Sequence, residues 1–297
     1  MRRAGFVSIL GRPNAGKSTL LNALLGQKLA IVSSRPQTTR TSIQGVLTLP
    51  EAQLVFIDTP GIHKSDSLLN KRMMDTVRVH TETDVALFLI DALAPFTEQD
   101  AQAVDLVKKI AAPVLAVVNK IDRLERKPKI LELIERYRSF YDFAEYIPVS
   151  ALTGEGLDTL RNEIINRLPE GPLLYPEDHL TDQPERFLAA EILREKILQH
   201  TREEVPHAVA VLIESWEDKP ALLRIAASIY VERQGQKTIL IGAGGSLLKK
   251  IGTLARRDME QIFGKKVFLQ TFVKVRPGWR EDPEFLAQAD WRSMAGT

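Results

Sequence analysis

The stretch GRPNAGKS, residues 11–18, is the most specific motif in the first part of the chain. It fits the pattern G-x-x-x-x-G-K-[ST] and lies between a strand-like run, GFVSIL (residues 5–10), and a segment with a helical pattern. In such a loop backbone N–H groups surround phosphate, the lysine reaches the β- and γ-phosphates, and the serine hydroxyl coordinates Mg²⁺. The stretch therefore predicts a nucleotide-phosphate site formed by Gly11, Arg12, Pro13, Asn14, Ala15, Gly16, Lys17, Ser18 and Thr19.

Short aliphatic runs alternate with amphipathic segments from this loop to about residue 168. EQDAQAVDLVKKIA (98–111) and GLDTLRNEIINRL (156–168) have a helical pattern. This alternation predicts an α/β fold in which helices cover both faces of a doubly wound, mainly parallel sheet. The expected strands after the first are AQLVFID (52–58), DVALFLID (84–91), APVLAVVN (112–119) and AEYIPVS (144–150).

The segment LVFIDTPG, residues 54–61, places a carboxylate at the end of an apolar strand. Asp58 can hold Mg²⁺ through water there, and the N–H of Gly61 can sense a γ-phosphate. Many strands end in Asp, so the signal is specific only because it follows the phosphate loop at this distance. We expect Asp58, Thr59, Pro60 and Gly61 to complete the phosphate and Mg²⁺ site.

Two further segments predict which base is bound. In NKID, residues 119–122, the Asp122 carboxylate can accept hydrogen bonds from N1–H and the 2-amino group of guanine. Adenine offers neither donor, so GTP and GDP are favoured over adenine nucleotides. Asn119 and Lys120 would brace the surrounding loops. The triplet Ser150, Ala151 and Leu152 would supply a backbone N–H for the guanine O6.

The chain changes character after the proline-rich stretch PEGPLLYPEDHLTDQPER, residues 169–186. We interpret residues 1–170 as one domain, 171–185 as a linker and 186–297 as a second, small α+β domain. In the second domain, patterns predict helices at residues 186–201 and 246–263 and strands at residues 208–216, 222–233 and 266–275. QKTILI, residues 236–241, is also strand-like.

A second glycine loop, GAGG at residues 242–245, opens the basic helix of the second domain. It fits the G-x-x-G loop of a KH domain, which clamps single-stranded RNA by its backbone. Between residues 233 and 280, eleven Lys and Arg face only two acids, a net charge of +9 that attracts polyanions. We expect RNA contacts from Gly242, Ala243, Gly244, Gly245, Lys249 and Lys250, with a groove lined by Ile239, Ile241, Leu247, Leu248 and Ile251, whose simpler role is in the core.

The composition of the chain excludes several kinds of site and of protein. The 297 residues carry a net charge of +2 and contain no cysteine, which excludes disulfides, thiolate metal sites and a cysteine nucleophile. The longest apolar runs are too short for a membrane span, and the N-terminus lacks the plan of a signal peptide. We therefore expect a cytoplasmic protein.

The four N-terminal segments resemble the G motifs of Ras-like P-loop GTPases. Together with a KH-like (type II) second domain, Ile62 after D-x-x-G and the loop PQTTR (36–40), they resemble the bacterial Era family over essentially the whole chain. The resemblance implies a slow GTPase that assists small-ribosomal-subunit assembly and binds the 3′ end of its rRNA. It also implies peripheral association with the inner membrane, which nothing in the periodicity of the sequence requires. We expect a monomer.

The resemblance also implies a switch I threonine that closes on Mg²⁺ and the γ-phosphate. Thr39 is favoured and Thr38 is its close rival, so the expected metal ligands are Ser18, Thr39 and Asp58. The expected catalytic residues are Lys17, Thr39, Asp58 and Gly61.

The residue after D-x-x-G departs from many GTPases, which carry a glutamine there to orient water. Ile62 cannot form that hydrogen bond, and His63 is a weaker candidate. In GTPases with an apolar residue at this position, an asparagine such as Asn14 can help place K⁺ near the phosphates. Our hypothesis is that K⁺ supplies positive charge there.

Two other functions compete with a GTP-hydrolysing RNA switch. One is a passive RNA-binding protein in which GTP is structural, against which the complete switch signature argues. The other is a GTPase of tRNA modification or membrane transport, disfavoured by the lack of cysteine, of a second G domain and of a membrane span. The basic surface could also meet anionic lipid, but a glycine loop opening a helix explains phosphate capture more simply.

Overall fold

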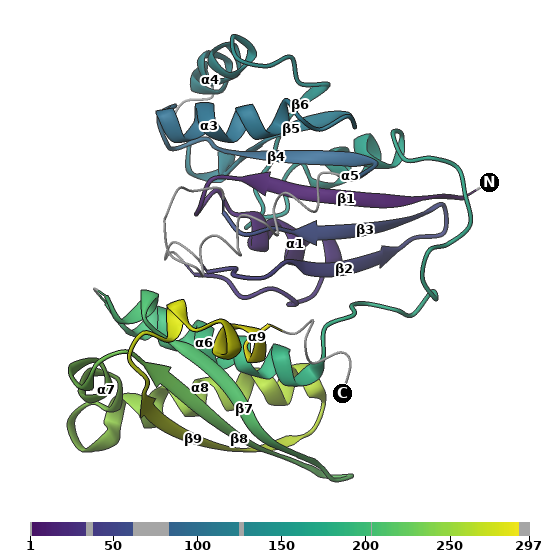
Figure 1. Ribbon diagram of the computed structural model, residues 1–297. Coiled ribbons are helices and arrows are strands. Elements are labelled where there is room, and N and C mark those ends of the chain that lie inside the picture. The colour runs from purple at the N-terminus through teal and green to yellow at the C-terminus, as the bar shows by residue number, and fades with distance from the viewer. Residues whose placement is uncertain (1, 34–37, 62–82, 125–127, 203, 291–297) are drawn as a thin grey trace. The chain divides into compact units, whose positions relative to one another are not determined.

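The computed structural model describes residues 2–33, 38–61, 83–124, 128–202 and 204–290 (Figure 1). The chain forms two compact units. Described residues of the first unit are 2–30, 39–61, 83–124 and 128–182. Those of the second are 31–33, 38, 183–202 and 204–290.

The first unit is built on a six-stranded sheet with the strand order β2-β3-β1-β4-β5-β6. Only β2 is antiparallel to its neighbour, and the other adjacent pairs are parallel. This order confirms the predicted doubly wound sheet. The strands are β1 (Arg3–Gly11), β2 (Ile43–Thr48), β3 (Ala52–Asp58), β4 (Val85–Asp91), β5 (Val114–Asn119) and β6 (Glu145–Pro148).

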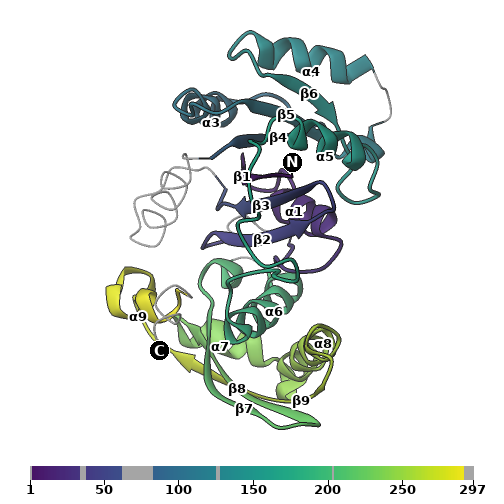
Figure 2. The ribbon, with the colours of Figure 1, turned by 90° about the vertical axis from the view of Figure 1, so that its right-hand side faces the viewer.

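Helices lie on both faces of this sheet, with α3 on one side and α1 and α5 on the other (Figure 2). Ala86, Phe88 and Ile90 of β4 pack with α3 and with Tyr137 of α4 in one apolar core. Every residue of β3 and β5 is buried, as expected for strands covered on both faces. The described helices are α1 (Lys17–Leu25), α3 (Glu98–Val107), α4 (Pro128–Arg138) and α5 (Leu157–Ile165).

The proline-rich segment is held against the first unit up to residue 182. Gln53 of β3 accepts hydrogen bonds from the backbone N–H groups of Leu174 and Tyr175, and Gln44 of β2 donates to the Tyr175 hydroxyl and to Asp182. The segment forms no helix or strand of its own between residues 171 and 182. Side-chain amides of β2 and β3 therefore fix this segment in place of regular secondary structure.

The second unit has a three-stranded sheet with the order β7-β8-β9, antiparallel between β7 and β8 and parallel between β8 and β9. Ile251, Ala255 and Met259 follow one face of α8 and are buried against the sheet. The predicted ranges of α8 and β9 agree with the structure at both ends. The elements are α6 (Glu185–His200), β7 (Ala210–Asp218), β8 (Leu222–Val231), α7 (Gln234–Ile241), α8 (Ser246–Phe263), β9 (Lys266–Val275) and α9 (Pro283–Gln288).

One predicted strand of this unit is wrong, because QKTILI forms part of helix α7. The Gln236 side chain accepts hydrogen bonds from the N–H groups of Glu232 and Arg233, which starts the helix. Gln236 and Leu240 are buried one turn apart, and Gly242 ends the helix with a φ of 74°. Capping and burial at helical spacing thus outweigh the β-propensity of the isoleucines.

The second unit also includes the chain segment that precedes Thr39. Ile31 joins the apolar core of α6, and the N–H of Val32 donates to Glu195 Oε1 at 2.8 Å. The carbonyl oxygen of Thr38 accepts a hydrogen bond from Arg194 Nη2. Helix α6 therefore fixes the backbone on the N-terminal side of the predicted switch threonine.

Candidate functional site

The predicted phosphate loop connects the end of β1 to the start of α1. Gly16 has a φ of 101°, and a Cβ there would lie 2.3 Å from the Asn119 side-chain nitrogen, so only glycine fits. Asn14 also has a positive φ, 64°, which asparagine tolerates better than most residues. The positive φ angles of Asn14 and Gly16 turn the backbone so that the loop curves between β1 and α1.

Lys17 is buried inside this loop. Its Nζ donates to the carbonyl oxygens of Gly11 at 3.1 Å and Arg12 at 2.9 Å. Burial lowers the pKa of Lys17 from 10.5 to about 8, although the charge of Asp58 acts in the opposite direction. Because burial disfavours the charged form of this lysine, an anionic partner such as phosphate would stabilise its ammonium.

Three oxygen-bearing side chains from separate segments converge beside the loop. Ser18 Oγ lies 2.8 Å from Thr39 Oγ1 and donates to Asp58 Oδ2 at 2.7 Å. Thr39 is buried, and its Oγ1 lies 3.4 Å from the same carboxylate oxygen. The side chain of Thr38 instead contacts the carbonyl of Ser33 at 3.5 Å. Of the two rival threonines, Thr39 is therefore the one beside Ser18 and Asp58.

The surroundings of Asp58 fit a hard cation. Its Oδ1 is buried and makes no hydrogen bond within the described residues. Burial raises the pKa of Asp58 to about 6, although the charge of Lys17 and the Ser18 and Thr39 hydrogen bonds lower it. Mg²⁺ prefers one or two carboxylates with other oxygen ligands. It would therefore give Oδ1 a partner and stabilise the ionised form of the buried carboxylate. The described residues contain no cluster of three or more His, Cys, Asp or Glu suited to a metal.

The rest of the D-x-x-G segment faces the phosphate loop. The Thr59 hydroxyl donates to the carbonyl of Ile9 at 2.8 Å. A Cβ on Gly61 would lie 2.8 Å from Pro13 Cα, so the two backbones approach as closely as glycine allows. Ile62 and His63 lie outside the described residues.

The predicted base-recognition residues form one connected network. Asn119 Nδ2 donates to the carbonyl of Ala15 at 2.9 Å, and its Oδ1 accepts from the N–H of Ala151 at 3.0 Å. Ser150 Oγ donates to Asp122 Oδ1 at 2.7 Å. The Asp122 side chain is exposed, and Leu152 is 77% exposed. Asn119 thus joins the phosphate loop to the loop after β6, and Asp122 remains accessible to a base.

Two acids that sequence reasoning missed are paired with this network. Lys120 Nζ donates to the carbonyl of Asn14 at 2.7 Å and to Asp91 Oδ2 at 2.6 Å. Arg12 Nη1 lies 2.6 Å from Asp100 Oδ2. Asp91 ends a predicted strand, and Asp100 completes a T-x-x-D capping pattern after Thr97. Those local signals marked the two acids, but their partners are distant in sequence.

The second glycine loop lies at the start of α8. Gly244 and Gly245 have φ values of 55° and 79°, and no atom lies within 4 Å of a Cβ built on either. Lys249 and Lys250 are exposed in the first turns of the helix. The loop is therefore open to a ligand, with two cations close to the helix N-terminus.

A groove of about 350 Å³ runs from this loop between α8 and β9. Of the five apolar residues expected to line it, only Leu248 does so. Ile251 is fully buried in the core, and Ile239 is 48% exposed. The groove is more polar than predicted, with the lining residues Gly245, Leu248, Lys249, Gly252, Thr253, Arg256, Leu269 and Thr271.

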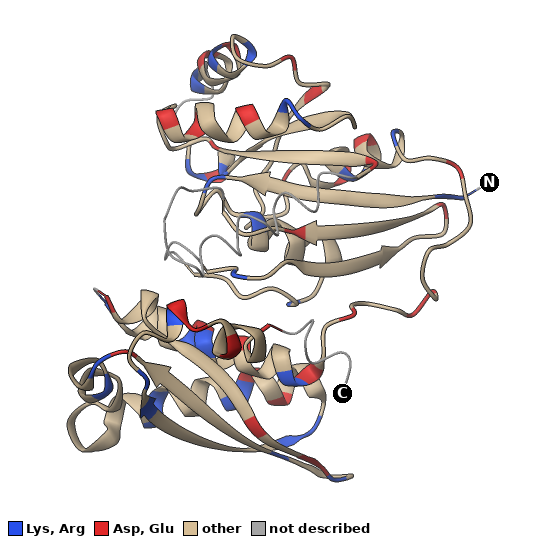
Figure 3. Cartoon of the chain, viewed as in Figure 1, with Lys and Arg blue, Asp and Glu red and all other residues tan. Residues whose placement is uncertain are grey.

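The positive charge of this unit is smaller than the sequence window suggested (Figure 3). Lys265 pairs with Asp218, and Lys274 pairs with Glu214. Both acids lie on β7, which precedes the window in sequence and is in the same three-stranded sheet as β9. Arg276 and Arg280 are also paired with acids outside the window, Asp282 and Glu232. A count along the chain misses these partners.

Phosphate, Mg²⁺ and base elements on a doubly wound sheet, followed by a G-x-x-G unit, define a P-loop GTPase joined to a KH domain. Residues 6–120 match the family model of 50S ribosome-binding GTPases, and residues 204–280 match that of KH domains. The chain is 50% identical to the GTPase Era of Geobacter metallireducens, over 96% of this chain and 97% of that protein. The chain belongs to the Era family of GTPases.

Other Era proteins are similar to this chain over almost its whole length. Identity to the GTPase Era of Syntrophus aciditrophicus is 46%, over 97% of this chain and 95% of that protein. The structure of an Aquifex aeolicus Era variant bound to GDP·AlF₄⁻ matches with a TM-score of 0.94 and 42% identity, covering 97% of this chain and 99% of that one. A structure of Era with MgGDPNP and nucleotides 1506–1542 of 16S ribosomal RNA matches with a TM-score of 0.95 and 42% identity, covering 98% and 99%. Within the described residues, we find no helix long and apolar enough to cross a membrane.

Proposed function

We propose that this chain is a GTP-hydrolysing switch that binds the 3′ end of the small-subunit rRNA and assists assembly of the small ribosomal subunit. The observation that supports the switch most strongly is the meeting of Ser18, Thr39 and Asp58 beside the phosphate loop. These residues come from the loop, from the predicted switch I and from the end of β3. A γ-phosphate and its Mg²⁺ would therefore bind groups from three segments at once, whereas GDP would leave the γ-phosphate contacts unmade.

In the proposed site, residues 11–19 hold the phosphates, and Asp122 with residues 150–152 reads guanine. Ser18, Thr39 and Asp58 would hold Mg²⁺, which when bound neutralises charge that develops on the phosphates. Lys17 would contact the β- and γ-phosphates, and the Gly61 N–H would bind the γ-phosphate. Hydrolysis adds water to the γ-phosphorus and breaks its bond to the β–γ bridging oxygen. We expect an unassisted rate on the order of 10⁻⁴ to 10⁻² s⁻¹.

We retain K⁺ as a proposed cofactor of this reaction. Asn14 is exposed on the phosphate loop with a positive φ, and its carbonyl is held by Lys120. Its side chain is therefore available to a monovalent cation while its backbone is fixed. Equal GTP turnover in Na⁺ and K⁺ buffers would remove K⁺ from the mechanism.

The RNA part of the proposal is supported by the open Gly244–Gly245 loop, the groove beside Lys249 and the 16S ribosomal RNA in the related Era structure. The proposed contacts are Gly242, Ala243, Gly244, Gly245, Lys249 and Lys250. We further propose that the protein is a cytoplasmic monomer that associates peripherally with the inner membrane. The proposed domain limits are 1–170 and 186–297, joined by residues 171–185.

Gly244→Asp tests the RNA site. An added side chain has room at this position, and aspartate tolerates a positive φ, so the change mainly places a carboxylate in the path of the RNA backbone. We expect the variant to keep GTP hydrolysis and to lose most of its affinity for a single-stranded RNA of the 16S 3′-end sequence. Unchanged affinity at two salt concentrations would show that the loop is not the clamp.

A further inference from the structure

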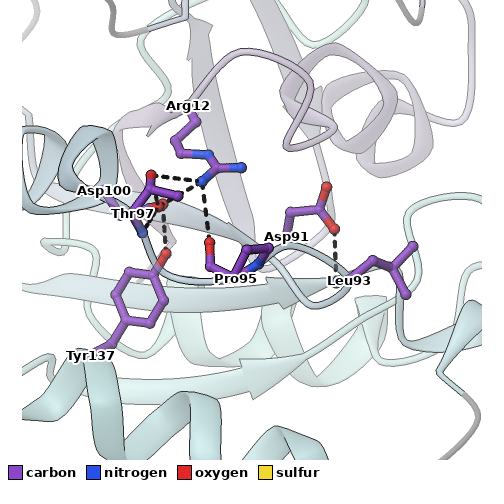
Figure 4. Close-up of polar contacts among 7 residues, drawn as sticks. All are labelled: Arg12, Asp91, Leu93, Pro95, Thr97, Asp100 and Tyr137. Atoms are coloured by element: carbon purple, nitrogen blue, oxygen red, sulfur yellow. Dashed lines mark hydrogen bonds and ion pairs between the residues drawn. The ribbon is translucent and has the colours of Figure 1, made fainter.

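Arg12, in the phosphate loop, directs its side chain toward helix α3 (Figure 4). Its Nη1 donates to Asp100 Oδ2 at 2.6 Å and to Thr97 Oγ1 at 3.2 Å. The Asp100 side chain is only 4% exposed and that of Arg12 is 18% exposed. This ion pair is shielded from water, so it is screened much less than a surface pair.

Asp100 is held by donors on both carboxylate oxygens. Oδ2 also accepts from the N–H of Thr97 at 2.8 Å and from its hydroxyl at 2.7 Å, and Oδ1 accepts from the Tyr137 hydroxyl at 2.7 Å. Burial raises the pKa of Tyr137, as does its bond to Asp100, so the phenol remains a donor. The carboxylate is thus fixed by α3 and α4, and Arg12 is the loop residue that it holds.

The loop residue held in this way also contacts the phosphate-binding lysine. The carbonyls of Gly11 and Arg12 both accept from Lys17 Nζ. Those carbonyls place the ammonium before it meets a nucleotide. A shift of the Arg12 backbone would therefore displace Lys17 as well as the N–H groups of the loop.

We propose that Asp100 is a positioning residue for the nucleotide site, which acts by anchoring the Arg12 side chain and thereby the backbone of the phosphate loop. The inference rests on the proposed nucleotide site. In this proposal the Arg12 side chain fixes the loop to α3, and Asp100 neutralises the Arg12 guanidinium. The alternative is that Asp100 serves only as the N-terminal cap of α3 through Thr97.

A double-mutant cycle on GDP affinity separates the two roles. Asp100→Asn and Arg12→Gln should each raise the Kd for GDP about tenfold, and the double variant should also be about tenfold weaker, because both changes break one interaction. Arg12→Lys, which can restore a single ion pair, should recover part of the affinity. The KM for GTP should rise together with the Kd for GDP, since both nucleotides use the same loop.

Two further variants separate stability from positioning. Tyr137→Phe removes a donor from Asp100 but leaves its pair with Arg12, so it should lower the Tm without changing the Kd for GDP. Asp105→Asn, on the exposed side of α3, is the matched control for loss of an acid. The inference is overturned if Asp100→Asn lowers the Tm but leaves the Kd unchanged, or if the cycle is additive. If Lys17→Ala also leaves the Kd unchanged, the nucleotide site itself is misplaced.

Discussion

Ser18 and Thr39 lie 21 positions apart in sequence, yet their side-chain oxygens are 2.8 Å apart and both meet Asp58. The position of Thr39 beside the phosphate loop is the relationship on which the proposed GTP switch depends. A hydroxyl that closes on Mg²⁺ only when a γ-phosphate is present distinguishes GTP from GDP. The residue before Thr39 belongs to the second unit, where the backbone carbonyl of Thr38 accepts a hydrogen bond from Arg194 of α6.

Thr39→Ala should lower GTP hydrolysis by at least about tenfold and leave GDP affinity within about twofold, since its hydroxyl acts with the γ-phosphate and Mg²⁺. Thr38→Ala is the matched control, because it removes the neighbouring threonine hydroxyl, which contacts the carbonyl of Ser33 at 3.5 Å. Single-turnover hydrolysis measures both. A larger loss from Thr38→Ala would reverse the assignment of the switch threonine.

Asp122→Asn should exchange the base preference from guanine to xanthine. The asparagine amide would donate to the xanthine C2 carbonyl and accept from N1–H, whereas guanine would place its 2-amino group against another donor. We expect GTP affinity to fall by about a hundredfold or more, with XTP gaining. Competition between labelled GDP and each nucleotide gives the result. Retained preference for GTP would mean that Asp122 does not contact the base.

The raised pKa of Asp58 predicts a pH-dependent stability when nucleotide and Mg²⁺ are left out. The carboxyl has a pKa of about 6 in the folded chain and 3.8 ordinarily, so the folded state binds the extra proton between these values. The free energy of unfolding should fall as the pH rises from about 4 to about 6 and remain lower above it. Asp58→Asn, which cannot titrate, should remove this dependence between pH 4 and pH 6. Urea unfolding at several pH values measures it, and an unchanged profile in the variant would place the titration elsewhere.

The lysines of the second glycine loop should contribute to RNA binding through charge alone. Lys249→Ala combined with Lys250→Ala should weaken RNA binding and reduce the slope of log K against log salt by about 1.4, roughly 0.7 for each phosphate contact of a single strand. Lys265→Ala is the control, because its ammonium is paired with Asp218. Equal losses in the two proteins would indicate a general electrostatic surface in place of a local clamp.

How much the sequence could predict depended on how local each signal was. Helix α8 and strand β9 were predicted with the observed ends, because α8 has one apolar face and ends at a glycine, and β9 is rich in β-branched and aromatic residues. Helix α7 was mistaken for a strand because its decisive signals were a cap and two buried residues one turn apart. Strand β2 was not recognised. Its sequence, IQGVLT, is short and contains Gly45, where a Cβ would lie 2.5 Å from Leu25.

The same distinction holds within the site. Gly16, Lys17 and Ser18 share one loop, so a pattern could identify them together. The Arg12–Asp100 and Lys120–Asp91 pairs join residues 88 and 29 positions apart, and only the folded sheet brings them together. Positive charge was overestimated for the same reason, since acids from β7 pair with lysines that follow α8.

We expect the nucleotide state of the first unit to control RNA binding, and the affinity for a single-stranded RNA of the 16S 3′-end sequence measures this control. The Kd would be measured with GDP and with a non-hydrolysable GTP analogue, in Mg²⁺ and at two salt concentrations. We predict tighter binding with the analogue, and loss of that difference in Thr39→Ala. Equal affinity in the two nucleotide states, at both salt concentrations, would rule out a GTP-controlled switch and leave a passive RNA-binding protein that also hydrolyses GTP.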